Sequence, residues 1–417
     1  MIDTSLLKEV VRDQAGMQPE APLVEREAME TLVSWHKTPF VVIVSGMRRC
    51  GKSTLLFQLR QKHPGYYLNF DDERLLKFTV EDFQPLYELF VELYGNRDIF
   101  YFDEIQNVVG WELFVRRLRD SGKKVYVTGS NASMLSQELG TRLTGRYIPL
   151  ILYPFSFREF LLLDGFTAPE LLHTTLGRGQ LKKLFNEYLE KGGIPEYVKT
   201  GNREYLKTIY ENIMYRDVLV RYKITNQKQM RELVQFVASN VGKEVSFNSL
   251  KKTLGLGSQT TVKEYFDYLE NSFLLFLLPK FAKSLKKQMY ANKKAYLIDT
   301  GLAVHIGYRL TADLGRLLEN LVFLELKRRK EEISFFKEKY ECDFILTDTA
   351  MQVCYALTAE NEKREFEGLI QAMRVTKRKK SLVLTYDQEE TRVYEGKHIQ
   401  ILPVWKWLVE STTARPT

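Results

Sequence analysis

The chain has 417 residues, more than one ordinary hydrophobic core supports, so we expect two or three domains. Its composition, 44% hydrophobic and 27% charged, excludes a disordered or collagen-like protein. The three cysteines, Cys50, Cys342 and Cys354, are widely spaced and odd in number. This argues against a disulfide framework or a zinc cluster and favours a reducing cytoplasm.

Two further features concern membranes and nucleic acid. The N-terminal residues lack an apolar signal-peptide segment, and the most apolar run, 273–278, is far shorter than the roughly 20 residues of a membrane-spanning helix. We therefore expect a cytoplasmic protein without a membrane anchor. The net charge is +8, and residues 241–300 hold ten Lys and Arg residues against five Asp and Glu residues. Such a local excess indicates either a surface that attracts nucleic acid or a merely solvated lysine-rich face.

A phosphate-binding loop follows the first run of β-branched residues. Val41–Val44 is typical of a strand buried on both faces, and it leads into SGMRRCGKSTLL, which contains G-x-x-x-x-G-K-S. The glycines let backbone N–H groups surround phosphate, while Lys52 reaches the β- and γ-phosphates and Ser53 coordinates Mg²⁺. The motif predicts ATP and Mg²⁺ as cofactors, with binding residues Gly46, Arg48, Arg49, Cys50, Gly51, Lys52, Ser53 and Thr54. The two arginines have a second interpretation, as loop side chains that are only solvated.

Two carboxylates end the second apolar run, Ile99–Phe102. Ligands bind at the carboxyl ends of parallel strands, so Asp103 is expected to hold Mg²⁺ and Glu104 to polarise the attacking water. The alternative is an exposed acidic turn. A third run, Val125–Thr128, ends in Gly-Ser-Asn, where polar side chains could sense the γ-phosphate or could form an ordinary turn.

GMRRCGKST, FYFDEIQNV, VTGSNASML, LTGRYIPLILYPFSF and GGIPEYV together resemble the AAA+ class of P-loop ATPases, in its bacterial and archaeal branch with a variable C-terminal region. The first four segments span about residues 41–157. The resemblance implies a strand order in which the strand ending at Thr128 lies between the other two. It also implies that Ser130 or Asn131 senses the γ-phosphate, and that the subunits form a homo-oligomeric ring such as a hexamer.

Members of this class complete the site with an arginine from the neighbouring subunit, which neutralises charge on the γ-phosphate. Arg146, just before the expected strand Tyr147–Leu152, matches that position best, and Arg142 is the second candidate. The alternative for Arg146 is an ion pair with surface carboxylates. No residue matches the arginine that the lid of such enzymes contributes, so that role stays unassigned.

The middle of the chain predicts a helical lid and a winged helix. Residues 169–231 are largely helical in pattern and are broken at GGIPEYV. This turn resembles the lid motif of the AAA+ class, but a Gly-Gly-x-Pro turn is also simply an effective helix breaker. Three further helices precede a hairpin, and Ser258 is a suitable N-cap for the third. A winged helix would place DNA contacts on and around that helix, whereas the same fold also serves to dock proteins. The expected contacts, with Ser258 and Thr261 nearby, are Lys251, Lys252, Gln259, Thr260, Lys263, Lys283, Lys286 and Lys287.

The last third resembles the restriction-endonuclease-like fold. LENLVFLELKRR is expected to be an amphipathic helix, followed by the strands ISFFKE, ECDFILT and MQVCYAL, and ILPVWKWLVE a closing helix. The resemblance implies a metal site in which Glu319 or Glu325 and Asp343 take two positions. The third reads Gln352-Val353-Cys354 instead of Glu-x-Lys, so we expect no cleavage. Asp343 has the alternative role of capping a strand.

We therefore expect an α/β protein with four parts: an AAA+ nucleotide-binding domain (1–165), a helical lid (166–229), a winged helix (230–300) and a degenerate nuclease-like domain (301–417). The expected activity is Mg²⁺-dependent ATP hydrolysis that moves or remodels DNA. The alternatives are a signalling switch with slow turnover and, third, a nuclease.

Overall fold

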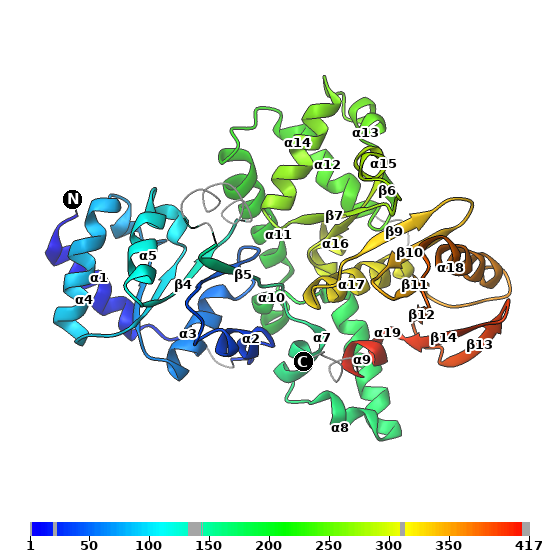
Figure 1. The fold of residues 1–417 in the computed structure, drawn as a ribbon, viewed down its shortest axis with the longest axis horizontal. Helices are drawn as coiled ribbons and strands as arrows, with labels where there is room; N and C mark the ends of the chain where they lie inside the picture. The colour runs from blue at the N-terminus through cyan, green and yellow to red at the C-terminus, as the bar shows by residue number, and fades with distance from the viewer. Residues whose placement is uncertain (1, 20–22, 132–142, 144, 309–312, 411–417) are drawn as a thin grey trace. The chain divides into compact units, whose positions relative to one another are not determined.

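The computed structural model describes residues 2–19, 23–131, 143, 145–308 and 313–410. The chain forms two compact units (Figure 1), an N-terminal unit (Met1–Tyr153 with Asn271–Phe273) and a C-terminal unit (Pro154–Glu270 with Leu274–Thr417). The units divide between Tyr153 and Pro154, and just after this division Phe155 N donates to Gly193 O (2.7 Å). The boundary expected at 165/166 stays a prediction. The divisions expected at 229/230 and 300/301 fall inside the C-terminal unit and also stay predictions. Within the described residues, no helix has the length and apolar character that crossing a membrane requires.

The N-terminal unit contains a parallel sheet of five strands in the order β2-β3-β4-β1-β5. The expected place of the Thr128 strand, between the other two, is therefore confirmed. The strand β2 had no prediction, because YYLN is short and lacks flanking motifs. The strands are β1 (Val41–Ser45), β2 (Tyr66–Asn69), β3 (Ile99–Asp103), β4 (Lys124–Gly129) and β5 (Tyr147–Ile151). The helices are α1 (Thr4–Gly16), α2 (Ala28–Ser34), α3 (Lys52–Lys62), η1 (Glu73–Leu75), η2 (Val80–Asp82), α4 (Phe83–Tyr94), η3 (Ile105–Asn107) and α5 (Trp111–Asp120).

The first part of the C-terminal unit is helical and carries a small antiparallel sheet in the order β6-β8-β7. Ser258 caps α14 as expected, since Thr261 N donates to Ser258 Oγ (3.0 Å). The helices are α7 (Phe157–Leu163), α8 (Ala168–Leu172), α9 (Thr175–Lys191), α10 (Pro195–Thr200), α11 (Arg203–Asn212), the π-helix η5 (Ile213–Val220), α12 (Gln227–Ser239), α13 (Phe247–Thr253), α14 (Gln259–Asn271), α15 (Leu285–Tyr290) and α16 (Thr300–Ile306). The strands are β6 (Glu244–Val245), β7 (Leu275–Pro279) and β8 (Lys293–Leu297).

The second part of this unit contains a six-stranded mixed sheet in the order β13-β14-β12-β11-β10-β9. The chain runs through α17, an antiparallel β9-β10-β11 meander, α18 and then β12, which is parallel to β11. The closing helix is shorter than expected, because residues 401–403 pair with β12 inside β14. The elements are α17 (Leu314–Arg328), β9 (Ser334–Lys337), β10 (Glu341–Ile345), β11 (Thr349–Val353), α18 (Glu362–Thr376), β12 (Lys380–Thr385), β13 (Glu390–Tyr394), β14 (Lys397–Pro403) and α19 (Val404–Glu410).

The helix α17 is buried on all sides rather than amphipathic. Every residue from 317 to 326 is buried, including Glu319 and Glu325. The expected exposed face is absent because β8, β11, α16 and α19 all pack against this helix. Two carboxylates therefore lie in the interior of the unit, where each needs a compensating partner.

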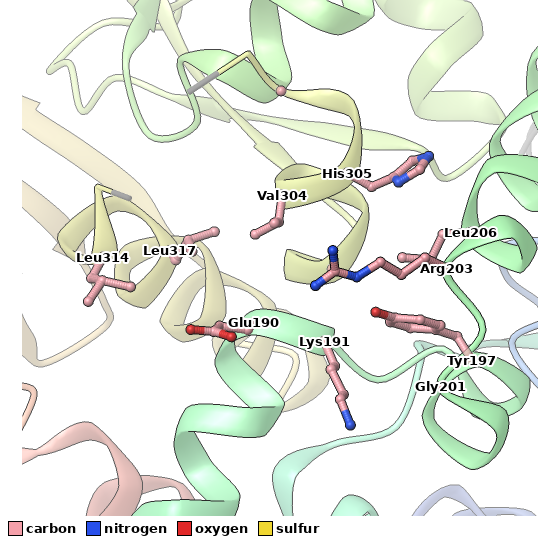
Figure 2. Close-up of a pocket in the computed structure, with 12 residues that line it drawn as sticks. Glu190, Lys191, Tyr197, Gly201, Arg203, Leu206, Val304, His305, Leu314 and Leu317 are labelled. Carbon is pink, nitrogen blue, oxygen red and sulfur yellow. The ribbon is translucent and has the colours of Figure 1, made fainter. Parts of the chain in front are cut away.

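A cavity of about 660 Å³ opens between the ends of α9, α10, α11, α16 and α17. Figure 2 shows the guanidinium of Arg203 and the ring of Tyr197 directed into it from one side, with Val304 and Leu317 opposite. Tyr197 belongs to GGIPEYV, so this segment builds one wall of the cavity.

Candidate functional site

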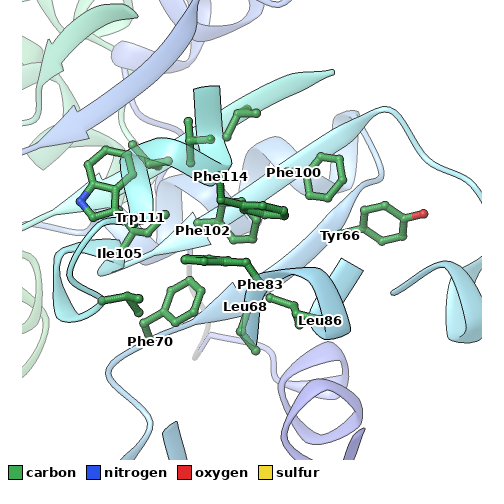
Figure 3. Packing of buried hydrophobic residues seen from close by; sticks show 14 of the residues in the cluster. Tyr66, Leu68, Phe70, Phe83, Leu86, Phe100, Phe102, Ile105, Trp111 and Phe114 are labelled. Carbon is green, nitrogen blue, oxygen red and sulfur yellow. The ribbon is translucent and has the colours of Figure 1, made fainter. Parts of the chain in front are cut away.

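An aromatic core holds the strands that carry the candidate residues. Phe100 and Phe102 lie on the same face of β3, because alternate residues of a strand share a face. Phe83 stacks on Phe114 with ring centroids 4.6 Å apart, and Figure 3 shows both rings beside Phe102. This packing gives the end of β3, where Asp103 lies, a defined position.

The phosphate loop joins β1 to α3 at the carboxyl edge of the sheet. A Cβ on Gly46 would lie 2.2 Å from the carbonyl oxygen of Leu152, so only glycine fits where the loop passes β5. Gly51 has φ +98° and precedes α3, a conformation that strains any residue with a side chain. Two glycines of the motif are thus required by geometry.

Lys52 lies buried beneath this loop. Its Nζ donates to the carbonyl oxygens of Gly46 (3.1 Å) and Met47 (3.2 Å) and lies 3.5 Å from Glu104 Oε1. Burial alone would lower the pKa of Lys52, but the neighbouring carboxylates of Glu104 and Asp103 raise it above its ordinary value. The ammonium group is therefore charged at the point where the loop meets β3.

Asp103 is fully buried at the end of β3. Its carboxylate accepts hydrogen bonds from Thr128 Oγ1, from the Tyr67 hydroxyl (3.2 Å) and from Ser53. Burial, followed by repulsion from Glu104, raises its pKa. The contact with Ser53 brings together a hydroxyl and a carboxylate oxygen, the kind of donors that Mg²⁺ prefers. These residues fit a Mg²⁺ ion.

Glu104 adopts a left-handed backbone conformation, with φ +49°. Its backbone N–H donates to Thr128 Oγ1 (2.8 Å), and its carboxylate accepts from Gln106 Nε2. Burial raises the pKa of Glu104, but the Lys52 ammonium outweighs this and holds it below the ordinary value. A charged carboxylate held in a strained conformation is typical of a functional site.

Thr128 and Arg26 contact the site although sequence reasoning assigned neither of them a role. Thr128 donates to Asp103 and accepts from the Glu104 backbone; its place at a strand end was the available signal. Arg26 is buried and donates to the carbonyl oxygens of Cys50 (2.8 Å) and Tyr153 (2.6 Å). No sequence signal pointed to Arg26, because its partners are distant along the chain.

The remaining expected residues of the loop and of the Thr128 strand differ in exposure. Ser130 and Asn131 are buried just beyond β4, on the strand adjacent to β1 and β3. Cys50 is buried, and burial raises the pKa of its thiol, so this side chain is neutral. In the loop and the first turn of α3, Arg48 and Thr54 are half-buried, whereas Arg49 and Ser53 are exposed.

Arg146 lies at the opposite edge of the sheet from the phosphate loop. Tyr147 pairs with Val41 in the parallel register of β5 and β1. Arg146 therefore lies at the amino ends of these strands, whereas the phosphate loop lies at their carboxyl ends. Its Nε lies 3.5 Å from Asp120 Oδ1, and 31% of its side chain is exposed. This is the ion pair with a surface carboxylate that the sequence allows as the alternative role of Arg146. Arg142 lies outside the described residues.

The expected DNA contacts lie on α13, α14 and α15, except Lys283, which lies between β7 and α15. Lys251 is half-buried and the other seven are exposed. Lys294, in contrast, belongs to the same basic segment but is buried. One of the ten positive charges of residues 241–300 is thus internal, and the basic surface is smaller than the sequence count implies.

The candidate carboxylates of the last third separate into two groups. Glu319 and Asp343 converge, because Lys294 Nζ contacts both, at 2.9 Å and 2.8 Å. Glu325 contacts Arg329 instead, at 2.9 Å. Between Glu319 and Glu325, the fold therefore brings Glu319 to Asp343. Asp343 does more than cap a strand.

Comparison with known proteins places the chain in a family. Residues 38–161 match the family model described as AAA domain, and residues 182–313 match a domain of unknown function, DUF8612. The uncharacterized protein MJ1544 of Methanocaldococcus jannaschii is 33% identical over 433 residues, which cover 98% of this chain and 96% of that protein. The chain belongs to the family of MJ1544. Its N-terminal unit is an AAA-type P-loop nucleotide-binding domain.

Other members and structures extend the comparison. An uncharacterized protein of Haemophilus influenzae is 31% identical over 409 residues, covering 93% of this chain and 99% of that protein. Among solved structures, the Walker-type ATPase PABY2304 of Pyrococcus abyssi is 15% identical with a TM-score of 0.44, covering 70% of this chain and 98% of that chain. The family of MJ1544 thus occurs in an archaeon and a bacterium.

Proposed function

We propose that this member of the MJ1544 family binds ATP with Mg²⁺ and hydrolyses it to ADP and phosphate. The observation that carries the proposal is the convergence of Lys52, Glu104, Asp103 and Ser53 where the phosphate loop meets β3. A cation for the phosphates, two oxygens for a metal and a charged base lie together where buried Lys52 and Asp103 meet half-buried Glu104 and exposed Ser53.

Each residue has a role in this proposal. Loop N–H groups and Lys52 bind the phosphates, and Ser53 and Asp103 hold Mg²⁺, which when bound neutralises charge on the β- and γ-phosphates. Glu104 orients water, whose oxygen attacks the γ-phosphorus while its proton passes to the carboxylate and the bond to ADP breaks. Buried Asn131 or Ser130 senses the γ-phosphate from the neighbouring strand.

An arginine supplied by a neighbouring subunit would complete the site. Arg146 precedes β5 by one residue, and a five-residue strand spans about 16 Å, so it lies too far from the phosphate loop of its own chain. This distance argues against a role in cis. The resemblance to the AAA+ class supports a role in trans in a homo-oligomeric ring, with the Asp120 pair holding the side chain in place.

The C-terminal unit supports DNA as the partner. Exposed Lys252 and Lys263 lie on α13 and α14, and exposed Lys283 lies between β7 and α15. The helices α12, α13 and α14 are followed by β7 and β8, which pair in antiparallel orientation, an order that fits a winged helix. The order of α17, three antiparallel strands, α18 and β12 fits a nuclease-like domain that does not cleave, because Gln352 and Cys354 replace the required residues. The alternative function is an assembly switch with slow turnover.

The ATPase assignment is tested with two substitutions and one control. Glu104→Gln is expected to retain ATP binding and lower kcat by at least about 100-fold, because the base is lost. Lys52→Ala should lose binding itself. Glu88→Gln, an exposed carboxylate on α4, is the matched control and should behave as wild type. Near-normal hydrolysis by Glu104→Gln contradicts the assignment.

DNA binding is tested by its dependence on salt. Because phosphate contacts release counterions, Lys251→Ala with Lys252→Ala should weaken binding to many sequences alike and lower the salt slope by about one per lost contact. ATPase rates with and without DNA separate the two functions: stimulation supports the DNA-remodelling ATPase, and slow turnover without DNA binding supports the switch.

A further inference from the structure

The C-terminal unit contains an ammonium group sealed inside a cluster of carboxylates. Lys294 lies on β8, and only 1% of its side chain is exposed. Its Nζ lies 2.9 Å from Glu319 Oε1, 2.8 Å from Asp343 Oδ1 and 2.7 Å from Glu341 Oε1. A buried charge persists only where opposite charges and hydrogen bonds replace water, and here three carboxylates do so.

The other contacts of the carboxylates are also made within the unit. Asp343 Oδ2 accepts from the backbone N–H of Val353 (2.9 Å), and Glu319 Oε1 accepts from the Tyr296 hydroxyl (2.6 Å). The backbone at Gly242 packs so closely that a Cβ there would lie 2.8 Å from Glu319 Oε2. The carboxylates are thus held in place by β8, β11 and the Gly242 backbone.

The cluster lies where the nuclease-like fold would bind a metal, yet its residues do not fit one. Mg²⁺ needs near-octahedral oxygen ligands at about 2.0–2.1 Å, and the lysine nitrogen lies at the centre of the set. The expected third ligand position holds Gln352, whose amide donates to Glu365 (2.6 Å) and whose oxygen accepts from the Asp343 N–H (3.2 Å). Within the described ranges, no group of three or more His, Cys, Asp or Glu residues could hold a metal ion.

We propose that the Lys294 ammonium takes the place of a divalent cation. Glu319, Glu341 and Asp343 form the remnant of a metal site, and the lysine fills it permanently from within the same chain. The cluster connects β8 of the small sheet to α17 and β10, so that residues of a former metal site now stabilise the packing of these elements. Removing the lysine charge should therefore reopen a site for Mn²⁺ or Ca²⁺, whatever the function of the phosphate loop.

The test compares the thermal unfolding of metal-free full-length variants with and without Mn²⁺. Lys294→Ala should unfold at a lower temperature than wild type, and saturating Mn²⁺ should raise its midpoint by about 5 °C more than that of wild type. Lys294→Ala with Asp343→Asn should lose this gain. Lys293→Ala, the half-buried neighbour on the same strand, is the matched control and should respond as wild type does. All variants keep the phosphate loop, so any rise in the unfolding midpoint from metal bound there is the same in each variant and cancels in the comparison.

Two outcomes would overturn the proposal. One is a Mn²⁺ response of Lys294→Ala no larger than that of wild type or of the double variant. If Lys294→Ala is unfolded when purified, it is refolded with Mn²⁺ or with chelator, and circular dichroism is measured. Recovery only with Mn²⁺ supports the proposal, whereas equal results in both conditions contradict it.

Discussion

At the scale of single residues, the Thr128 hydroxyl connects the two acidic residues of the site. It donates to the Asp103 carboxylate and accepts from the Glu104 N–H (2.8 Å). Thr128→Val preserves shape but leaves both groups without this partner, so kcat should fall about 10- to 100-fold while ATP binding changes little. Single-turnover hydrolysis and nucleotide titration measure this. Thr128→Ser keeps the hydroxyl and should restore the rate; a valine variant with wild-type kcat would show that the contact has no catalytic role.

At the scale of elements, the GGIPEYV turn is tied to the start of α16 by Asp299. Its carboxylate accepts from the N–H groups of Gly193 (2.7 Å) and Leu302 (3.0 Å), and a Cβ on Gly192 would lie 2.2 Å from it. A Cβ on Gly193 would lie 2.2 Å from the carbonyl oxygen of Phe155, so the segment that resembles a lid motif has a structural requirement for both glycines. Burial raises the pKa of Asp299 to about 6 despite these hydrogen bonds.

This raised pKa predicts a pH dependence of stability. Folding favours the protonated form, so the contribution of Asp299 is fully present below the unfolded pKa and is lost as pH rises through about 6. This contribution of Asp299 to the free energy of unfolding amounts to at most about 3 kcal/mol. In urea unfolding, the free energy of unfolding of wild type minus that of Asp299→Asn should therefore increase as pH falls from 7 to 5. A difference that is constant with pH contradicts the prediction.

At the scale of the whole molecule, the proposed role of Arg146 in trans predicts that hydrolysis depends on assembly. Arg146→Ala and Lys52→Ala should each be inactive, and their mixture should regain part of the activity, because each supplies what the other lacks. ATPase rate and solution mass are measured together. Arg116→Ala is the matched control, since Arg116 also pairs with Asp120 (3.6 Å), and it should stay active alone. A co-assembled but inactive mixture would transfer the role to Arg142.

The sequence by itself determined the nucleotide-binding part of this protein. Its strands other than β2, its phosphate loop and the Asp103–Glu104 pair are local patterns, in which a short apolar run, fixed glycines and adjacent charges carry the information. The same reasoning held for the Ser258 cap, because a cap and its helix are neighbours along the chain.

The tertiary structure alone decided which distant groups meet. Arg26 reaches the carbonyl of Cys50, Thr128 meets Asp103, and Lys294 meets Asp343, contacts that link residues 24, 25 and 49 positions apart. From the sequence, Lys294 counted toward a basic surface, and α17 was expected to have a polar face. Both expectations were wrong for one reason. Periodicity and charge are local properties of the sequence, whereas the burial of a side chain depends on which elements pack around it.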